Sequence, residues 1–344
     1  MDDARICLEV IQTAWQHGAK VANYVGAVDF EHRNGMIQSV QVRNRIGNRE
    51  GVIHARQVLN ATGPWVDAVE KLAGGSGRER LQPTKGVHLV LPNLGLSSAF
   101  LLLHPVDGRV FFVIPWMRRT LLGTTDTFAS ESADRLTVTP SEEEYLLAGY
   151  NHHFDQPFKA EHILGRFAGL RPLLKADAHH PSARSREFAV WEGPGGMLSV
   201  GGGKFTTYRH MAEIITDAVS RKLGYSVGCR TRHLKLTGAP VEPWHTFVER
   251  EVKAFSRRGL RPEIAHHLMN RYGRHARNVA AVALATPRGL DRIVPDEPEL
   301  LGELEYQKHA EMAMLPEDHW LRRTRLGLYH TIAACGFAGD RPSN

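Results

Sequence analysis

The chain has 344 residues, of which 42% are hydrophobic and 23% charged, and its formal net charge is +6. This length allows two or three domains, and the composition is that of an ordinary globular protein with a sizeable core. The scattered cysteines Cys7, Cys229 and Cys335 argue against a disulfide framework and favour a reducing compartment. No apolar run is long enough to span a bilayer, and the first residues have no signal-peptide pattern.

The basic balance attracts anions such as phosphorylated metabolites, anionic lipid or nucleic acid. We find no nucleic-acid module and no basic stripe with interleaved aromatic residues, so a solvated basic surface is the preferred interpretation and no nucleic-acid partner is expected. The chain has 19 histidines, several of them in adjacent pairs. Adjacent side chains on regular structure point in different directions, so these pairs are poor chelates and we predict no metal site.

The predicted elements follow one another in a definite order. Apolar residues at helical spacing predict a helix over residues 4–17, ended by Gly18. Short strands, a glycine turn and a short helix are expected next, at 20–24, 37–43, 52–55, 58–63 and 64–72. A strand-rich block covers 86–125, and a helix (141–153), a strand (197–201) and a helix (206–223) follow. From about 236 to 329 the pattern is almost wholly helical. A strand-rich block inserted into an α/β domain suits a flavoprotein in which a substrate sheet covers the cofactor.

Asn60–Asp67 reads Asn-Ala-Thr-Gly-Pro-Trp-Val-Asp, a strand that ends in a turn of small residues. Such a turn lets the backbone approach a ligand closely. From the residues alone, an ordinary strand-to-helix turn is slightly favoured.

Gly201–Arg209 reads Gly-Gly-Gly-Lys-Phe-Thr-Thr-Tyr-Arg and precedes a predicted helix. A helix N-terminus stabilises an anion, and Lys204 adds a full positive charge, so this turn suits a reduced flavin. A Walker phosphate loop is excluded because Phe205 follows the lysine. A glycine helix cap with an incidental lysine is a third interpretation.

Two arginines and one histidine are also candidates. Arg171 lies between apolar residues and next to a proline, and Arg186 lies in Ser-Arg-Glu-Phe (185–188). A guanidinium suits a phosphate or carboxylate, although a structural ion pair is an equal alternative for each. His88 lies in an apolar strand. A core histidine is the more common finding there, but its ordinary pKa also suits a base that removes a hydroxyl proton.

These segments occur together in one order. The series comprises 61–65, 84–88, 107–116, 122–127, 168–173, 185–188 and 202–209. In this series the chain resembles the FAD-dependent glycerol-3-phosphate dehydrogenases that feed the respiratory quinone pool. The resemblance runs from about Asp3 to Leu328, and residues 311–327 are similar to the helical C-terminal domain of that family.

The resemblance implies a role for each matching residue. Lys204, with the backbone around Gly203 and Thr206, would face the flavin pyrimidine ring. His88 would be the base, and Arg171 and Arg186 would bind the substrate phosphate. The remaining cofactor-binding residues would be Ala61, Thr62, Gly63 and Trp65 beside the dinucleotide, and Ala27, after the predicted strand 20–24, near adenine.

The implied reaction is hydride transfer from sn-glycerol 3-phosphate to FAD, which gives dihydroxyacetone phosphate, with electrons then passed to a quinone. The resemblance implies a cytoplasmic protein whose membrane contact is at most peripheral, on the inner face of the cytoplasmic membrane.

The expected fold class is α/β (α+β). It comprises an incomplete FAD-binding Rossmann-like domain, an inserted antiparallel substrate-binding sheet and a C-terminal helical domain. The predicted division is 1–75 for the first part of the FAD-binding domain, 76–165 for the substrate sheet, 166–235 for the return to the FAD-binding domain and 236–344 for the helical domain.

One departure from the family pattern is large. Family members begin with a strand, a Gly-x-Gly-x-x-Gly turn and a helix that bind the cofactor pyrophosphate, and this sequence has no such turn. A further family arginine for the substrate phosphate is missing with it. The expectation is a truncated gene, a mis-assigned start or a fragment, with weak or no FAD binding by residues 1–344 alone.

Two alternatives remain open at this stage. A related FAD-dependent oxidoreductase for an amine or amino acid would not need two arginines suited to phosphate. A non-catalytic remnant or binding module is the alternative of another class.

Overall fold

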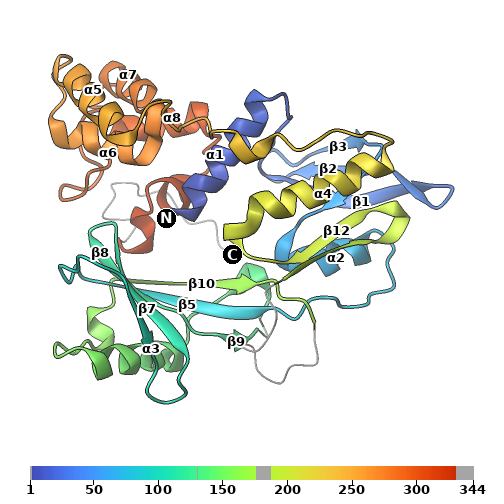
Figure 1. Ribbon diagram of the computed structural model, residues 1–344, viewed down its shortest axis with the longest axis horizontal. Coiled ribbons are helices and arrows are strands. Elements are labelled where there is room, and N and C mark those ends of the chain that lie inside the picture. The colour runs from blue at the N-terminus through green and yellow to red at the C-terminus, as the bar shows by residue number, and fades with distance from the viewer. Residues whose placement is uncertain (1, 130, 176–186, 331–344) are drawn as a thin grey trace. The chain divides into compact units, whose positions relative to one another are not determined.

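The computed structural model describes residues 2–129, 131–175 and 187–330 (Figure 1). These residues divide into two compact units. Residues 2–23 and 234–330 form a helical unit, and the described residues between 24 and 233 form a unit rich in strands. The helical unit is therefore built from both ends of the described chain.

The helical unit contains five α-helices among its described residues: α1 (Asp3–Gln16), α5 (Trp244–Ser256), α6 (Pro262–Tyr272), α7 (Ala276–Ala285) and α8 (Leu301–Ala310). Helix α1 begins where the Asp2 carboxylate accepts a hydrogen bond from the Arg5 amide at 3.0 Å, which satisfies one of the unpaired groups of the first turn. Helix α6 begins at Pro262, whose fixed backbone angle suits that position. None of the described helices is long and apolar enough to cross a membrane.

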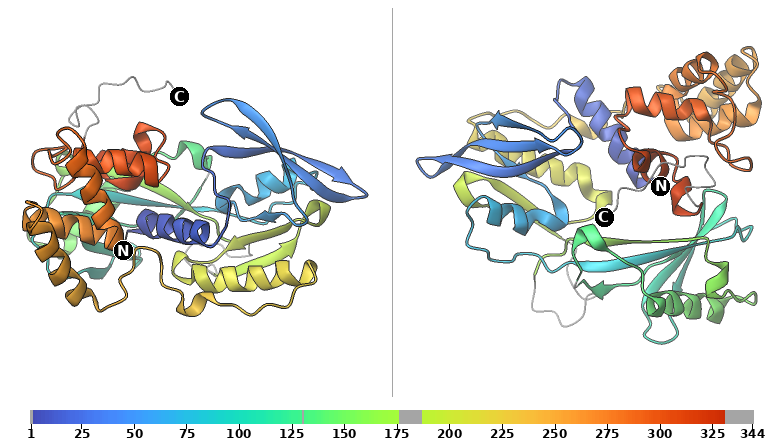
Figure 2. Two further views of the ribbon diagram at one scale, coloured as in Figure 1. Left: turned by 90° about the horizontal axis from the view of Figure 1, so that it is seen from above. Right: turned by 180° about the vertical axis from the view of Figure 1, so that it is seen from behind.

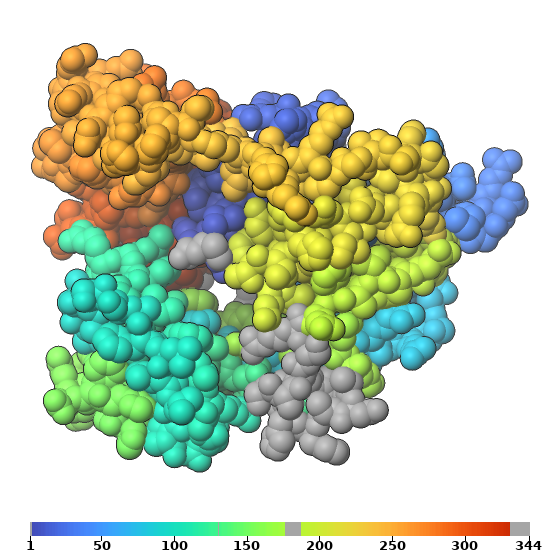
Figure 3. All heavy atoms as spheres, viewed as in Figure 1, coloured from blue at the N-terminus to red at the C-terminus, as the bar shows by residue number. Residues whose placement is uncertain are grey.

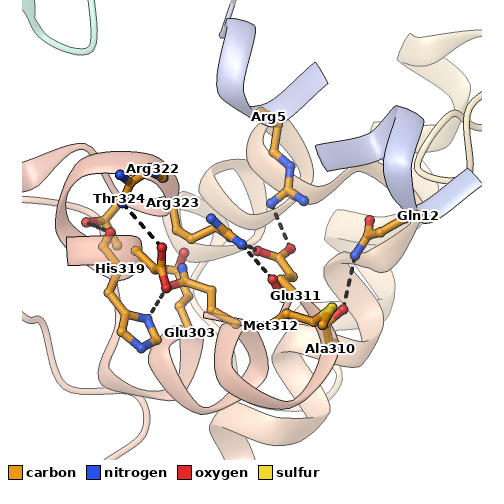
Figure 4. A network of polar contacts seen from close by, with 12 residues as sticks. Arg5, Gln12, Glu303, Ala310, Glu311, Met312, His319, Arg322, Arg323 and Thr324 are labelled. Carbon is orange, nitrogen blue, oxygen red and sulfur yellow. Dashed lines mark hydrogen bonds and ion pairs between the residues drawn. The ribbon is translucent and has the colours of Figure 1, made fainter. Parts of the chain in front are cut away.

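Buried ion pairs join α1 to the C-terminal part of the helical unit. Arg5 of α1 and Arg323 both point toward the Glu311 carboxylate, at 2.7 and 3.1 Å (Figure 4). Glu311 is 2% exposed, and burial raises its pKa although both guanidinium groups act to lower it. The attraction therefore only partly offsets the cost of removing this carboxylate from water.

In the strand-rich unit, β1 (Val25–Arg33), β2 (Met36–Asn44) and β3 (Arg49–His54) form an antiparallel sheet of their own. The predicted strand at 20–24 is wrong, because the strand starts only at Val25. Tyr24 has a left-handed backbone (φ 56°), and the Asn23 side chain donates to the Met312 carbonyl at 2.7 Å. Both features interrupt an extended run before Val25.

A second, short sheet has the order β11-β12-β4. It combines β11 (Phe188–Glu192), β12 (Leu198–Gly202) and β4 (Leu59–Asn60) with the helices α2 (Val66–Leu72) and α4 (Tyr208–Lys222). Strand β4 runs parallel to β12, as expected in an α/β domain. In Figure 2 (left), the β1–β3 sheet and α4 lie on opposite sides of this short sheet. The outer face of α4, in yellow, is open to solvent in Figure 3.

The largest sheet has the order β10-β5-β8-β7-β6, with β9 also paired to β5. Its strands are β5 (Thr84–Leu91), β6 (Phe100–Leu103), β7 (Val110–Trp116), β8 (Arg119–Gly123), β9 (Thr127–Phe128) and β10 (Gly165–Arg171). All of its strand pairs are antiparallel.

Helix α3 (Pro140–His153) covers one face of this sheet (Figure 1). Val87 and Leu89 of β5 point toward it and pack with Leu146 and Tyr150 in one apolar core. Because strand side chains alternate, the residues between these positions point to the other face. The expected α/β (α+β) class, with an inserted antiparallel sheet and a C-terminal helical domain, is confirmed.

Candidate functional site

The face of the large sheet that points away from α3 carries the predicted substrate residues. In the strand register, Phe167 of β10 lies opposite His88 of β5, and His88 lies opposite Gly123 of β8. Along the same two strands, Arg171 lies opposite Thr84. Since directly opposed residues share a face, His88 and Arg171 point to the same side of the sheet.

The Arg171 guanidinium extends over the neighbouring strand at Gly86. A Cβ atom at Gly86 would lie 2.5 Å from Arg171 Nη2, so any larger residue here would force the guanidinium to move. Nη1 donates to Asp126 Oδ1 at 3.1 Å, and Nη2 donates to Thr124 Oγ1 at 3.1 Å. The guanidinium is thus held in place while part of its surface stays exposed. A cation fixed in this way is suited to an anionic ligand.

His88 stacks on the Phe167 ring at a centroid distance of 5.1 Å. A Cβ atom at Gly123 would lie 2.4 Å from His88 Cδ2, so the imidazole lies across this glycine. Burial, assisted by the nearby positive charge of Arg171, lowers the pKa of His88 to about 4. At neutral pH the ring is therefore uncharged, and one nitrogen is available as a proton acceptor.

The glycine turn after β12 lies beside the end of β10. The Gly202 amide donates to the carbonyl of Pro172 at 3.0 Å, and Pro172 directly follows Arg171. Gly202 and Gly203 have φ angles of 79° and 87°, which favour glycine. Lys204 follows and is exposed, and Thr206 lies in the short 3-10 turn Phe205–Thr207 before α4. The backbone contact between Gly202 and Pro172 therefore brings this turn to the arginine end of the substrate face.

A cavity of about 640 Å³ lies in the other part of the same unit. Its lining includes Ala27 on β1, Thr62 and Trp65 in the turn after β4, and Met197 before β12. This volume lies within the range of small-molecule sites. Three predicted cofactor residues from separate parts of the sequence thus line one cavity.

Hydrogen bonds fix the turn that borders this cavity. Thr62 Oγ1 donates to Asn60 Oδ1 at 2.7 Å, and Asn60 Nδ2 donates to the Val66 carbonyl at 2.9 Å. Ala61 lies between the two polar residues, and Gly63 has a left-handed backbone (φ 59°). Trp65 Nε1 donates to Asp134 Oδ2 at 3.4 Å.

The structure brings the predicted residues into two groups, the substrate face with the adjoining glycine turn and the cavity at Trp65. Arg186 lies outside the described residues. Asn60, Thr124 and Asp126 support the site and were not assigned roles from the sequence. Thr124 and Asp126 lie in the Leu-Gly-Thr-Thr-Asp-Thr segment that the sequence analysis had singled out. Their role could not be read from it, because their contact with Arg171 depends on the fold. Among the described residues, no group of three or more His, Cys, Asp or Glu side chains could hold a metal ion.

Comparison with known proteins gives matches along most of the chain. A family model described as FAD dependent oxidoreductase matches residues 1–217, and one described as the C-terminal domain of alpha-glycerophosphate oxidase matches residues 229–338. The aerobic glycerol-3-phosphate dehydrogenase of Staphylococcus epidermidis is 35% identical over 335 residues, which cover 94% of this chain. The protein of that name from Staphylococcus saprophyticus is 34% identical over the same share. The chain spans 60% of the length of these curated relatives.

A solved structure is similar over almost the whole chain. It is the glycerol-3-phosphate dehydrogenase from Bacillus halodurans complexed with FAD, at a TM-score of 0.86 and 30% identity. The similarity covers 97% of this chain and 66% of the other.

Proposed function

Because this chain belongs to the family of FAD-dependent oxidoreductases, we propose that the protein oxidises sn-glycerol 3-phosphate to dihydroxyacetone phosphate, with FAD as the hydride acceptor. The resemblance to the FAD-dependent glycerol-3-phosphate dehydrogenases is confirmed, as is FAD as the cofactor of the family. One observation carries the choice of substrate. An uncharged imidazole and a fixed guanidinium point to the same face of one sheet.

Arg171 would bind the substrate phosphate. Its Nη1 and Nη2 atoms are oriented by Asp126 and Thr124, so little further ordering is needed when an anion binds. The hydroxyl of Thr84, opposite Arg171, is buried and has no hydrogen-bond partner among the described residues. A phosphate oxygen near this end of the face would be an acceptor for it. Arg186 stays a second proposed phosphate ligand.

His88 would accept the proton of the hydroxyl at C2. A ring whose pKa is about 4 is uncharged near neutral pH, so it need not first lose a proton. When bound, FAD would supply the two-electron acceptor for the hydride from C2. The Phe167 ring stacked on His88 limits the rotation of the imidazole.

The cofactor-binding residues fit two parts of FAD. Ala27, Thr62 and Trp65, with Ala61 and Gly63 in the same turn, would hold the adenosine end in the cavity of about 640 Å³. Gly203, Lys204 and Thr206 would hold the flavin pyrimidine, since two glycines with positive φ keep that turn free of side chains. The sequence has no Gly-x-Gly-x-x-Gly turn for the pyrophosphate.

We also propose a quinone as the electron acceptor and a cytoplasmic location, with peripheral contact to the inner face of the cytoplasmic membrane. The family resemblance supports the quinone, and the net charge of +6 supports contact with anionic lipid. Reduction of a soluble quinone analogue at a rate well above that of oxygen uptake is the expected result.

The test of the substrate uses the 344-residue chain, calorimetric titration with sn-glycerol 3-phosphate, and dye reduction with added FAD. The variant Arg171→Ala should weaken binding at least tenfold, because a charge-assisted bidentate contact is lost. Arg166→Ala is the matched control, since Arg166 lies on the same strand but is paired to Glu143 of α3.

Neutral glycerol separates this function from amine or amino-acid oxidation. Its weak binding should be the same in wild type and in Arg171→Ala. An equal loss for the phosphorylated and the neutral compound would contradict the proposal. Binding of sn-glycerol 3-phosphate without dye reduction, at an FAD concentration that saturates the chain, would favour the non-catalytic alternative.

A further inference from the structure

We propose that three glycines on neighbouring strands, Gly169 of β10, Gly86 of β5 and Gly123 of β8, together make room for the substrate. Gly86 and Gly123 admit the two substrate-binding side chains, and the carbon chain of the substrate lies over Gly169. We further propose that Gly169 sets the largest substrate that fits. The inference rests on the proposed function, because it takes His88 and Arg171 as the two ends of the substrate site.

The three glycines lie on one face of the sheet. Gly169 lies opposite Gly86, and Gly123 lies opposite His88, two residues further along β5. Glycine weakens a strand because it adds backbone freedom and packs no side chain. Within a strand it commonly marks a place where a ligand or another chain segment approaches the backbone closely.

Two of the glycines are explained by their neighbours in the protein. A Cβ atom at Gly86 would lie 2.5 Å from the Arg171 guanidinium, and one at Gly123 would lie 2.4 Å from the His88 ring. Each glycine thus makes room for one of the proposed substrate-binding side chains.

Gly169 has no such explanation. No atom of the described residues lies within 4 Å of the position that its Cβ would occupy, and Gly169 is exposed. Its φ angle also lies outside the range that L side chains rarely adopt. Neither space nor backbone geometry among the described residues requires glycine here, and an exposed glycine within a strand leaves the backbone open to the approach of a ligand.

The size of this opening suits a short substrate. Arg171 brings its guanidinium back over Gly86, and His88 is two residues away on the same strand. Two residues of an extended strand span about 7 Å. A three-carbon phosphate ester can contact both ends of such a space, and its carbon chain would lie over Gly169.

The experiment is calorimetric titration of the 344-residue chain with two probes, sn-glycerol 3-phosphate and inorganic phosphate. Gly169→Ala should weaken binding of sn-glycerol 3-phosphate about tenfold or more, since one methyl group in a fitted site has an effect of this order. Binding of inorganic phosphate should stay within about twofold, because the guanidinium of Arg171 is untouched.

Gly228→Ala is the matched control. Gly228 also has no described atom within 4 Å of its Cβ position and no positive φ, but it lies after α4, away from the sheet. It should bind both probes as wild type does, and both variants should unfold at the temperature of the wild type.

Three results would overturn the inference. Gly169→Ala could bind sn-glycerol 3-phosphate as tightly as wild type, or it could lose both probes equally, which would place its effect on Arg171. A clear fall in its unfolding temperature would contradict the open space on which the inference rests. Failure of the proposed function has a different signature, because the wild-type chain itself would then bind neither probe.

Discussion

At the scale of the residue, His88 lies where burial and the positive charge of Arg171 both oppose its protonation. Its pKa is about 4 in the folded chain, compared with the ordinary value of 6.5 for an unfolded chain. Between these two pH values the unfolded state binds more protons than the folded state. Acid therefore favours unfolding in this window. The destabilising effect is absent above about pH 6.5, where the ring is uncharged in both states.

We predict that the free energy of unfolding of the wild type falls relative to that of His88→Gln as the pH decreases from 6.5 to 4. The expected relative loss is about 3 kcal/mol, because each pKa unit corresponds to about 1.4 kcal/mol. Urea unfolding of both proteins across this range measures the difference, and effects of other titrating groups cancel. A constant difference between the two proteins would show that His88 is protonated equally in both states.

His88 and Arg171 were predicted as separate candidates, because residue type and apolar surroundings are visible in the sequence. The meaning of Gly86, Gly123 and Gly169 depends on which strands are neighbours and in which register. That information is absent from the local pattern of any one strand.

At the scale of the element, α3 supports the substrate face from behind. Its first turn is closed by a capping box in which the Thr139 amide donates to Glu142 Oε2 at 2.9 Å. The same carboxylate pairs at 3.0 Å with Lys85 of β5, whose side chain is 7% exposed. Glu142 thus ties the start of the helix to strand β5 of the sheet.

Glu142→Ala should lower the free energy of unfolding by about 1 to 3 kcal/mol, since it removes a helix cap and leaves a buried lysine with fewer partners. Glu144→Ala is the control, because Glu144 lies on the same helix and is exposed. Chemical denaturation of the two variants should separate them clearly. Equal values would show that the contact with Lys85 contributes nothing measurable.

Helix α1 depends in a similar way on Glu311. The variant Glu311→Ala should destabilise the helical unit by about 3 to 5 kcal/mol, because it leaves Arg5 buried without its main counter-charge. Glu263→Ala removes the same charge from an exposed pair with Arg261 and should cost less than about 1 kcal/mol. Hydrogen exchange of the α1 amides compares the two variants with the wild type. Unchanged protection of these amides in Glu311→Ala would contradict this account.

Many elements were predictable because their local signals agree, as in α3, whose capping box, initial proline and acidic first turn all mark its start. Strand β1 was missed for a physical reason. Its pairing with β2 is irregular between Ala27 and Asp29 and again between Glu31 and His32. Each irregularity shifts the alternation of apolar and polar residues, so the two-residue period is lost.

At the scale of the whole molecule, the two ends of FAD have candidate residues but the pyrophosphate has no glycine turn in this sequence. We predict that residues 1–344, expressed and desalted, retain little or no flavin in the visible spectrum. The physical reason is that the phosphate charges would lack the backbone amides of a helix N-terminus. A stoichiometric flavin band would contradict this prediction.

The order of motifs was sufficient to identify the family, and the comparisons agree with it. Which residues belong to each of the two units was harder to predict from the sequence. Residues 2–23 pack with residues after 234, and a local pattern carries no information about a partner that far away. The four predicted domain segments and the roles of the site residues stay predictions.

The pairing of Arg5 with Glu311 also has a consequence for the order of events during synthesis. About 300 residues separate the two, so at 5–20 residues per second the ribosome needs roughly 15 to 60 s to deliver the partner of α1. The strand-rich unit, whose residues are contiguous, can be complete before then. During this interval Glu9 and Thr13, the buried residues of α1, stay open to water, so this helix completes its packing only after the end of the helical unit has been made.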